Sequence, residues 1–276
     1  MMTEAKSAEV AVMDPEAARR FLLEQPAGSY TLLDVRQPWE YEERHLPGAT
    51  LVPLGELPGR VQELDPARPV LAYCAAGGRS RAAAQLLSSL GFREVYNLAG
   101  GIYAYNGLTA TGPEGLHQEL VRGDESPAEA LTLAYGLERA LQAFYEAVAQ
   151  AAQDAELASF CRQMMQVEAA HQERLRHRYA EITPTADPAS LAAAGAEVME
   201  GGFQLSEFLA RNAPYLTTLA AALELALTVE TQALDLYLRL ARKCREEATR
   251  QVFFEIAEEE KAHLAALSRL WEQKRR

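Results

Sequence analysis

The stretch Glu168-Ala169-Ala170-His171 recurs later in the chain as Glu260-Lys261-Ala262-His263. Each copy follows a leading glutamate by thirty residues, Glu138 in the first case and Glu230 in the second. Residues i and i+3 share one face of a helix, so each copy turns a carboxylate and an imidazole toward the same side. Four carboxylates and two imidazoles from four helices predict a dinuclear, carboxylate-bridged metal site.

The types of ligand indicate which metals this site would hold. Four negative charges inside a bundle are stable only beside cations that neutralise them. Ligands without thiolates favour iron, with manganese as the alternative, over structural zinc. We expect two metal ions with one histidine each, bridged by Glu168 and Glu260 and bound terminally by Glu138 and Glu230. A single Glu-x-x-His pair usually belongs to a solvated helix face, and it is the duplication that favours metal binding.

A tyrosine follows each leading glutamate by seven residues, at Tyr145 and Tyr237. Seven residues span about two helical turns, so each tyrosine shares a helix face with its glutamate. We expect each hydroxyl to donate a hydrogen bond to a ligand carboxylate on the opposing helical hairpin and to hold that ligand in place.

The C-terminal half has the composition of long helices. Apolar residues recur there at helical spacing, and no proline lies in 128–182 or after 214. The pattern predicts four helices, over 128–151, 154–181, 215–247 and 249–274. Short connections predict two antiparallel hairpins. The long segment between the hairpins predicts a crossover along the bundle, with short helices near 189–200 and 203–211.

The N-terminal part alternates short strands and helices. Strands are predicted at 30–35, 48–52, 69–73 and 94–96, and helices at 14–23, 54–64 and 80–90. This order predicts an α/β domain with a mostly parallel sheet. Residues 113–127 are rich in glycine, proline and charge and predict a linker, so the domains are 1–112 and 128–276.

A second chemical centre is predicted at Cys74-Ala75-Ala76-Gly77-Gly78-Arg79-Ser80, between a buried strand and a helix. A loop of small residues can turn several backbone N–H groups toward one sulfur, and the helix N-terminus adds positive potential. Both effects lower the pKa of the thiol and stabilise an anion such as a persulfide. Arg79 adds a charge that would hold an anionic donor such as thiosulfate.

Two other interpretations of this loop are open. A cysteine phosphatase needs Cys-x5-Arg to enclose a tetrahedral oxyanion, whereas Arg79 gives Cys-x4-Arg, which favours sulfur over phosphate. An inert buried cysteine is the other alternative, and the strand, glycine loop and helix around Cys74 argue against it. The remaining cysteines, Cys161 and Cys244, are predicted to be core residues that form no disulfide with each other.

Composition limits the partners. The net charge of −12 and the pI near 5.0 argue against binding to nucleic acid or to an anionic membrane surface. Three cysteines form no disulfide framework and predict a reducing compartment. The N-terminus has no apolar segment typical of a secretory signal, so we expect a cytoplasmic location.

Residues 128–276 resemble the ferritin-like superfamily, and rubrerythrins in particular, at the four glutamates and two histidines named above. The resemblance implies a diiron centre that reduces peroxide or oxygen or oxidises iron. Rubrerythrins typically carry a further glutamate three residues after the ligand of the third helix, where this chain has Ala233. This difference predicts a more symmetrical, ferritin-type centre. The absence of any Cys-x-x-Cys pair implies an external electron donor.

Residues 8–110 resemble the rhodanese family. The matching segments are Leu33-Asp34-Val35-Arg36, Glu40-Tyr41, His45-Leu46-Pro47-Gly48-Ala49, the loop 74–80, and Leu98-Ala99-Gly100-Gly101. The resemblance implies sulfur transfer through a persulfide on Cys74. Asp34 and Arg36 are expected to form a structural ion pair near the loop.

The two halves together predict a sulfurtransferase that passes sulfane sulfur from a small donor to a thiol or cyanide, coupled to a diiron redox domain. One alternative is a sulfur-sensing or docking module on a metal-binding dimerisation domain, without turnover. Another is a diiron peroxidase or oxidase with an accessory rhodanese domain. A homodimer is expected, because ferritin-like domains commonly pair.

Overall fold

The computed structural model describes residues 10–185, residue 191 and residues 195–274. The chain divides into two compact units between Leu116 and His117, within the predicted linker. Each unit is described by itself below.

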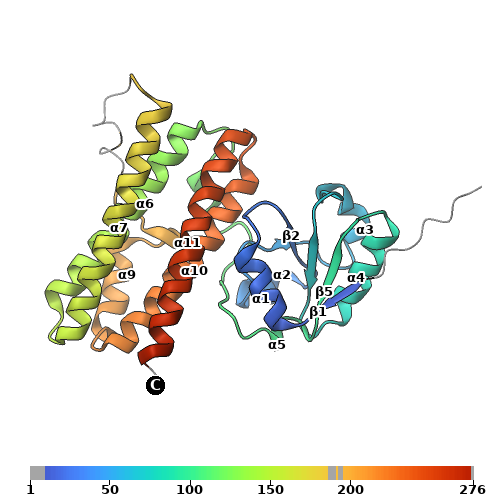
Figure 1. Ribbon diagram of the computed structural model, residues 1–276, viewed down its shortest axis with the longest axis horizontal. Coiled ribbons are helices and arrows are strands. Elements are labelled where there is room, and N and C mark those ends of the chain that lie inside the picture. The colour runs from blue at the N-terminus through green and yellow to red at the C-terminus, as the bar shows by residue number, and fades with distance from the viewer. Residues whose placement is uncertain (1–9, 186–190, 192–194, 275–276) are drawn as a thin grey trace, which may run out of the picture. The chain divides into compact units, whose positions relative to one another are not determined.

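The first unit is built on a five-stranded sheet in the order β1-β5-β4-β2-β3 (Figure 1). Every neighbouring pair of strands is parallel, which confirms the predicted α/β fold. The strands are β1 (Ala11–Met13), β2 (Thr31–Asp34), β3 (Thr50–Leu51), β4 (Val70–Tyr73) and β5 (Val95–Leu98). The edge strand β1 was not predicted, because three residues with two exposed side chains carry no readable alternation.

Helices cover both faces of this sheet, and the strand residues alternate between two cores. Leu33 and Ala72 pack with α3 and α4, whereas Leu32 and Leu71 pack with α1, α2 and α5. The helices are α1 (Pro15–Glu24), α2 (Pro38–Glu43), α3 (Leu57–Arg60), α4 (Gly78–Ser89) and α5 (Gly101–Ala104), and the 3₁₀ turn η1 (Val61–Glu63) follows α3.

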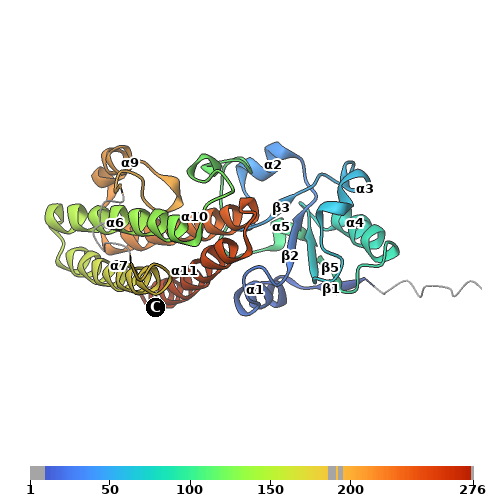
Figure 2. The same cartoon turned by 90° about the horizontal axis from the view of Figure 1, so that it is seen from above.

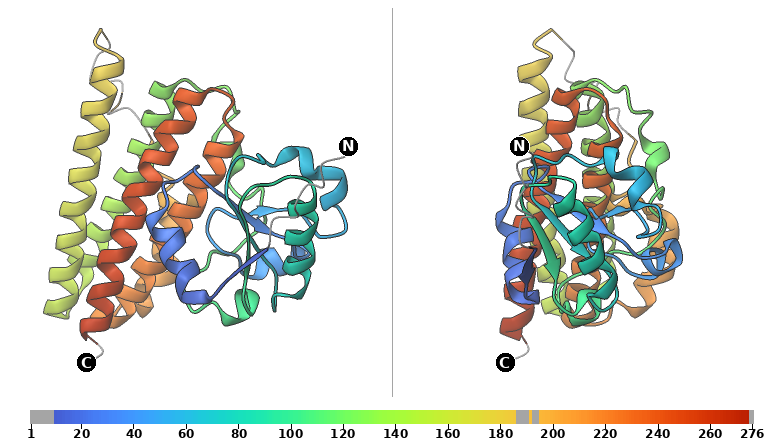
Figure 3. Two further views of the ribbon diagram at one scale, coloured as in Figure 1. Left: turned by 45° about the vertical axis from the view of Figure 1, so that its right-hand side comes forward. Right: turned by 90° about the vertical axis from the view of Figure 1, so that its right-hand side faces the viewer.

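The second unit is a bundle of four long helices, as predicted. They are α6 (Pro127–Ala151), α7 (Ala155–Ile182), α10 (Leu219–Lys243) and α11 (Glu247–Lys274). Figure 2 shows α6 beside α7 and α10 beside α11, and both pairs are in contact along their length. The four helices run side by side in Figure 3, and α6 also contacts α11 while α7 contacts α10.

Side-chain caps set the starts of these helices. Ser126 and Glu129 form a capping box at α6, with Pro127 in the first turn. Asp154 accepts a hydrogen bond from the Leu157 amide at α7. Thr218 caps α10 by accepting from the Ala221 amide, so this helix begins four residues later than predicted.

The crossover between α7 and α10 differs from the prediction. Of the predicted helix near 189–200, residues 189, 190 and 192–194 lie outside the described residues, and 195–199 are not helical. The 3₁₀ turn η3 (Glu200–Gly202) follows them. The second predicted helix is confirmed as α9 (Leu205–Asn212), and the turn η4 (Ala213–Tyr215) leads from it toward α10. The turn η3 contacts α6 and α10.

Residues 117–126 pack on the bundle, although they belong to the segment predicted as a linker. Lys243 Nζ donates to the carbonyls of Gln118, in the turn η2 (Gln118–Leu120), and Val121. The Arg245 amide donates to Gly123 O, 2.9 Å away. None of the described helices is long and apolar enough to cross a membrane.

Candidate functional site

Cys74 follows β4 directly, and its loop leads into α4 at Gly78. Gly77 ends the loop with φ +91°, a conformation that favours glycine. A Cβ there would also lie only 3.2 Å from Gly100 N. Backbone conformation and limited space therefore both call for glycine at this position.

A second turn, at Gly100 and Gly101, supports the loop from outside. The amide of Ile102 donates to Cys74 O at 2.8 Å, and the amide of Tyr103 donates to Ala75 O at 3.1 Å. A Cβ on Gly101 would lie 2.2 Å from Cys74 O, so only glycine permits this close approach. The pair Gly100-Gly101 thus fixes the shape of the cysteine loop.

Donors converge on the sulfur of Cys74. The Gly77 amide lies 3.1 Å from Sγ, and Ser80 Oγ lies 3.4 Å from it. Burial acts to raise the pKa of Cys74, but hydrogen bonds from the Ser80 side chain and from the amides of Ser80, Ala76 and Gly77 outweigh it. The net pKa lies below the ordinary value of a cysteine thiol, as the loop composition predicts.

Asn97 is a neighbour of this site that the sequence did not indicate. It is buried on β5, and its Oδ1 lies 2.6 Å from Ser80 Oγ. The Ser80 hydroxyl has a single proton, which serves either Asn97 or the sulfur at one time. Asn97 therefore holds Ser80 in place and competes for the proton that Ser80 offers to Cys74.

The other two cysteines have the opposite chemistry. Cys161 and Cys244 are free and buried, and burial raises the pKa of each to about 11. No hydrogen bond to either sulfur contributes to lowering its pKa. Cys74 is the thiol whose surroundings favour the thiolate.

Arg79 does not present the unpaired charge that we expected. Its guanidinium donates two hydrogen bonds to Glu40, at 2.7 and 2.6 Å. This contact is the main reason why the pKa of Glu40 is lowered. The carboxylate neutralises Arg79, so the loop amides are the groups that face an incoming anion without a competing partner charge.

Asp34 and Arg36 form a buried ion pair at the end of β2. Arg36 Nη2 lies 2.6 Å from Asp34 Oδ2 and also donates to Arg44 O. The guanidinium stacks over the Tyr73 ring, 5.4 Å from its centroid. The pair thus ties β2, the end of α2 and β4 together beside the cysteine loop.

The duplicated motif converges inside the helical bundle. His171 Nδ1 lies 3.0 Å from Glu138 Oε1, and His263 Nδ1 lies 3.3 Å from Glu230 Oε2. The two imidazole rings stack with centroids 3.9 Å apart. Sets of three possible ligand atoms, each set within 4.8 Å, are His171–Glu260–His263 and Glu138–Glu168–His171. Both imidazoles turn Nδ1 toward the acidic cluster.

The acidic cluster is buried and has fewer hydrogen-bond donors than carboxylate oxygens. Glu168, Glu230 and Glu260 are fully buried, and Glu138 is 1% exposed. Both carboxylate oxygens of Glu168 and of Glu260, and one each of Glu138 and Glu230, have no hydrogen-bond partner among the described residues. Buried, unsatisfied carboxylates are unfavourable without cations. This donor set therefore fits a pair of divalent or trivalent metal ions.

The pKa values of the candidate ligands are shifted. Burial acts to lower the pKa of His263, but the hydrogen bond to Glu230 and the charge of that carboxylate outweigh burial and raise it. Burial raises the pKa of Glu168 and of Glu260 well above the ordinary value, and the charges of neighbouring carboxylates add to the effect. Burial, His263 and Arg174 together lower the pKa of His171 to about 2, so its imidazole is neutral, as a metal ligand must be.

The tyrosines behave differently from one another. Tyr237 Oη donates to Glu200 Oε1 at 2.6 Å, whereas Tyr145 Oη is buried and has no hydrogen-bond partner among the described residues. The hydrogen bond predicted for Tyr145 is thus not formed. The acceptor of Tyr237 lies in the crossover and not on the opposing hairpin.

Glu200 is the carboxylate that the sequence analysis missed. It is fully buried, and one of its oxygens lies within 4.8 Å of oxygens of Glu138 and Glu260. Because Ala233 replaces the further glutamate of rubrerythrins, we expected a symmetrical cluster of four glutamates. Glu200 makes the acidic cluster asymmetric. A lone glutamate in a glycine-rich connection gives no periodic signal, and only Glu200-Gly201-Gly202 marks a tight buried turn.

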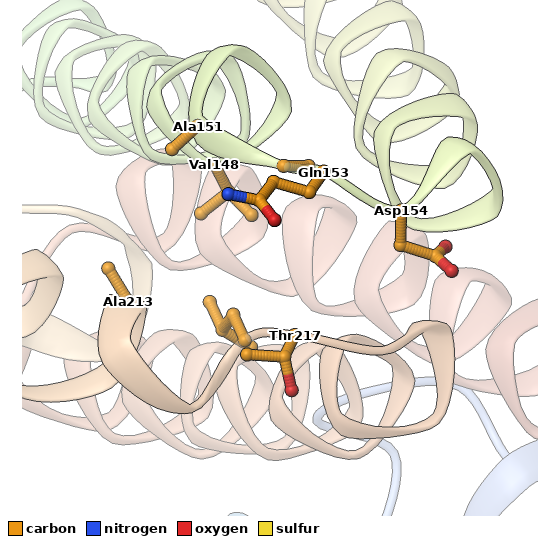
Figure 4. A pocket seen from close by; sticks show the side chains of 8 residues that line it. Val148, Ala151, Gln153, Asp154, Ala213 and Thr217 are labelled. Carbon is orange, nitrogen blue, oxygen red and sulfur yellow. The ribbon is translucent and has the colours of Figure 1, made fainter.

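A cavity of about 300 Å³ lies at the end of the bundle where α6 turns into α7 (Figure 4). It is formed by the α6–α7 turn and by the segment that leads into α10, and Figure 4 shows Gln153, Asp154 and Thr217 around it. Asp154 is its single ionisable lining residue and also caps α7. None of the predicted site residues lines this cavity, so it is separate from both candidate centres.

Comparison with known proteins agrees with both halves. Residues 18–108 match the family of rhodanese-like domains, and residues 129–271 match the rubrerythrin family. A protein described as a sulfurtransferase from Allochromatium vinosum is 38% identical over 86 residues, which cover 30% of this chain and 80% of that protein.

Two relatives come from Bacillus subtilis. The putative sulfur carrier protein YrkF is 38% identical over 81 residues, and the uncharacterized protein YqhL is 43% identical over 76 residues. The matches take in 29% and 28% of this chain. The chain spans only 44% of YrkF and 60% of YqhL.

Solved structures also align with the N-terminal unit. A rhodanese from E. coli, solved with anions, is 34% identical and covers 30% of this chain and 99% of its own, with a TM-score of 0.28. The Alr3790 protein from Anabaena is 32% identical and covers 36% of this chain and 80% of its own, with a TM-score of 0.33.

The match over 129–271 takes in more than half of the chain, and the sulfurtransferase relative is covered over most of its length. The N-terminal sheet and the C-terminal bundle have the folds that these matches require. The chain therefore belongs to the rubrerythrin family through residues 129–271 and carries a rhodanese-like domain ahead of them.

Proposed function

We propose that the N-terminal domain transfers sulfane sulfur through a persulfide on Cys74. The Cys74 thiolate attacks the outer sulfur of a donor such as thiosulfate. A sulfur–sulfur bond forms on the enzyme, the sulfur–sulfur bond of thiosulfate breaks, and sulfite leaves with the bonding electron pair. A thiolate or cyanide then attacks the terminal sulfur and releases Cys74 as a thiolate.

The observation that carries this proposal is the set of donors around Cys74 Sγ. The Gly77 amide and the Ser80 hydroxyl stabilise negative charge on the attacking sulfur, and the lowered pKa of Cys74 raises the thiolate fraction near neutral pH. Because Glu40 neutralises Arg79, we assign the binding of an anionic donor to the loop amides and the N-terminus of α4.

For the C-terminal domain, we propose that a pair of iron ions is bound by Glu138, Glu168, His171, Glu230, Glu260 and His263, with manganese as the alternative metal. Such a pair would supply redox chemistry with peroxide or oxygen. The chain's residues hold the ions in place, bring imidazole nitrogens toward them, and exclude water by burial.

The two centres need different partners. The sulfur site requires a small donor and a thiol or cyanide acceptor. Redox turnover at the metal site would draw on an external electron donor. We expect both reactions to run in a reducing, cytoplasmic compartment, and we expect a homodimer. Coupling between the sites is part of this proposal.

The sulfurtransferase proposal is tested by incubating the full-length protein with thiosulfate and measuring its intact mass. We expect a gain of one sulfur atom, which cyanide removes as thiocyanate. Cys74→Ser should show neither the gain nor any thiocyanate, whereas Cys161→Ser should behave as the unchanged protein. Thiocyanate production by Cys74→Ser at the normal rate would contradict the proposal.

A further inference from the structure

Glu200 reaches the interior of the bundle because of the turn that carries it. Gly201 and Gly202 have φ values of +74° and +81°, which favour glycine. A Cβ on Gly201 would lie 2.9 Å from Gln232 Cβ on α10, and one on Gly202 would lie 2.1 Å from His117 Cδ2. The two glycines therefore let the backbone of η3 pack closely and bury the glutamate that precedes them.

The two carboxylate oxygens of Glu200 have different surroundings. Oε1 accepts a hydrogen bond from Tyr237 Oη at 2.6 Å. Oε2 is buried and has no hydrogen-bond partner among the described residues. One oxygen each of Glu138, Glu200 and Glu260 lies within 4.8 Å of the others. Three buried carboxylates at this separation repel one another when ionised, and a cation among them offsets that repulsion.

The position of Glu200 is also asymmetric. The other acidic ligands occur in two copies related by the repeated motif, whereas Glu200 belongs to the crossover, which occurs once. It lies within 4.8 Å of ligand oxygens from both copies, Glu138 of the first and Glu260 of the second. A ligand from this turn has no counterpart in a second copy, so it makes the two metal positions unequal.

We propose that Glu200 is a fifth carboxylate ligand of the dimetal centre, oriented by Tyr237, and that, because it occurs once, it makes the two metal positions unequal. This proposal rests on the proposed metal binding. Tyr237 is a positioning residue here, because it acts on the metal through the Glu200 carboxylate. The centre then has five carboxylates and two imidazoles for two ions.

The test titrates the metal-free, full-length protein with ferrous iron under nitrogen, in competition with a chromophoric chelator. We expect two ions per chain in the unchanged protein. Glu200→Gln keeps an acceptor for Tyr237 but removes the charge, and it should weaken one of the two ions by at least about tenfold while the other keeps its affinity. Glu197→Gln, an exposed glutamate of the same crossover, is the matched control and should change neither.

Mössbauer spectra of the iron-57 protein give a readout that does not depend on activity. We expect two quadrupole doublets of equal area, of which Glu200→Gln shifts only one. Tyr237→Phe leaves the carboxylate in place and should shift the same doublet by a smaller amount. It also supplies the test if circular dichroism shows that Glu200→Gln does not fold.

The outcomes separate the two proposals. Wild-type protein that binds no iron would refute the proposed metal function itself. Wild-type protein that binds two ions, with affinities and spectra that neither Glu200→Gln nor Tyr237→Phe alters, would refute only the role of Glu200. Equal weakening of both ions would refute the asymmetry.

Discussion

Replacing Ser80 by alanine removes the hydroxyl that lies 3.4 Å from Cys74 Sγ and leaves the Gly77 amide in place. A hydrogen bond to a charged group contributes about 1.5–3 kcal/mol, and Asn97 competes for the Ser80 proton, so we take the lower end of that range. One pKa unit corresponds to about 1.4 kcal/mol. We therefore expect Ser80→Ala to raise the pKa of Cys74 by about one unit.

The assay follows the rate of alkylation of the full-length protein by iodoacetamide as a function of pH. Because burial raises the pKa of Cys161 and Cys244 to about 11, these thiols do not contribute below about pH 9. Well below the pKa, the alkylation rate of Ser80→Ala should fall about tenfold, in proportion to the thiolate fraction.

Ser89→Ala is the matched control, because this exposed residue lies on the same helix and its hydroxyl donates to Leu86 O. It should leave the pH profile unchanged. Ser80→Ala also leaves Asn97 without its partner, so the melting temperature is measured in parallel. A folded Ser80→Ala protein with the wild-type pH profile would show that the hydroxyl does not stabilise the thiolate and would refute this explanation of the lowered pKa.

Three further predictions concern the loop, the ion pair and the metal-free bundle. Gly101→Ala places a Cβ 2.2 Å from Cys74 O and should lower both the melting temperature and the rate of sulfur transfer. Gly78→Ala, whose Cβ would meet nothing within 4 Å, should change them little. Equal effects of the two substitutions in thermal melts and thiocyanate assays would contradict this prediction. Asp34→Ala leaves Arg36 buried and unpaired and should cost about 3–5 kcal/mol in urea unfolding, and a loss below about 1 kcal/mol would argue against a structural role. Burial raises the pKa of Glu200 from 4.5 to about 8, so the folded metal-free protein keeps a proton that the unfolded chain releases. The contribution of Glu200, measured as the difference in free energy of unfolding between the unchanged protein and Glu200→Gln, should be fully present below about pH 4.5 and be lost as the pH rises toward 8. A contribution that grows over this range in urea titrations would contradict the sign.

The sequence predicted the parts of the structure that depend on repetition or on local composition. The doubled Glu-x-x-His motif gave the residues that converge in the bundle, because helical periodicity alone places residues i and i+3 together. The loop at Cys74 was predicted from small residues between a strand and a helix. The helix ends were less accurate, since the start of α10 depends on the cap at Thr218.

Contacts between distant segments were not predictable from one sequence. Arg79 of α4 pairs with Glu40 of α2, which is 39 residues away, and this pairing depends on where the fold places the two helices. Asn97 joins Ser80 across two elements in the same way. Glu200 was missed because its burial follows from the packing of two glycines against α10, and no spacing rule marks it.

The most direct measurement is the iron content of the full-length protein after anaerobic loading with ferrous iron and removal of unbound metal. The convergence of both motif copies predicts two ions per chain, and Glu168→Ala combined with Glu260→Ala should remove them, because both residues lie fully buried in the cluster. Equal iron content in the two proteins, or none in the unchanged protein, would contradict the assignment of these residues to a shared metal centre.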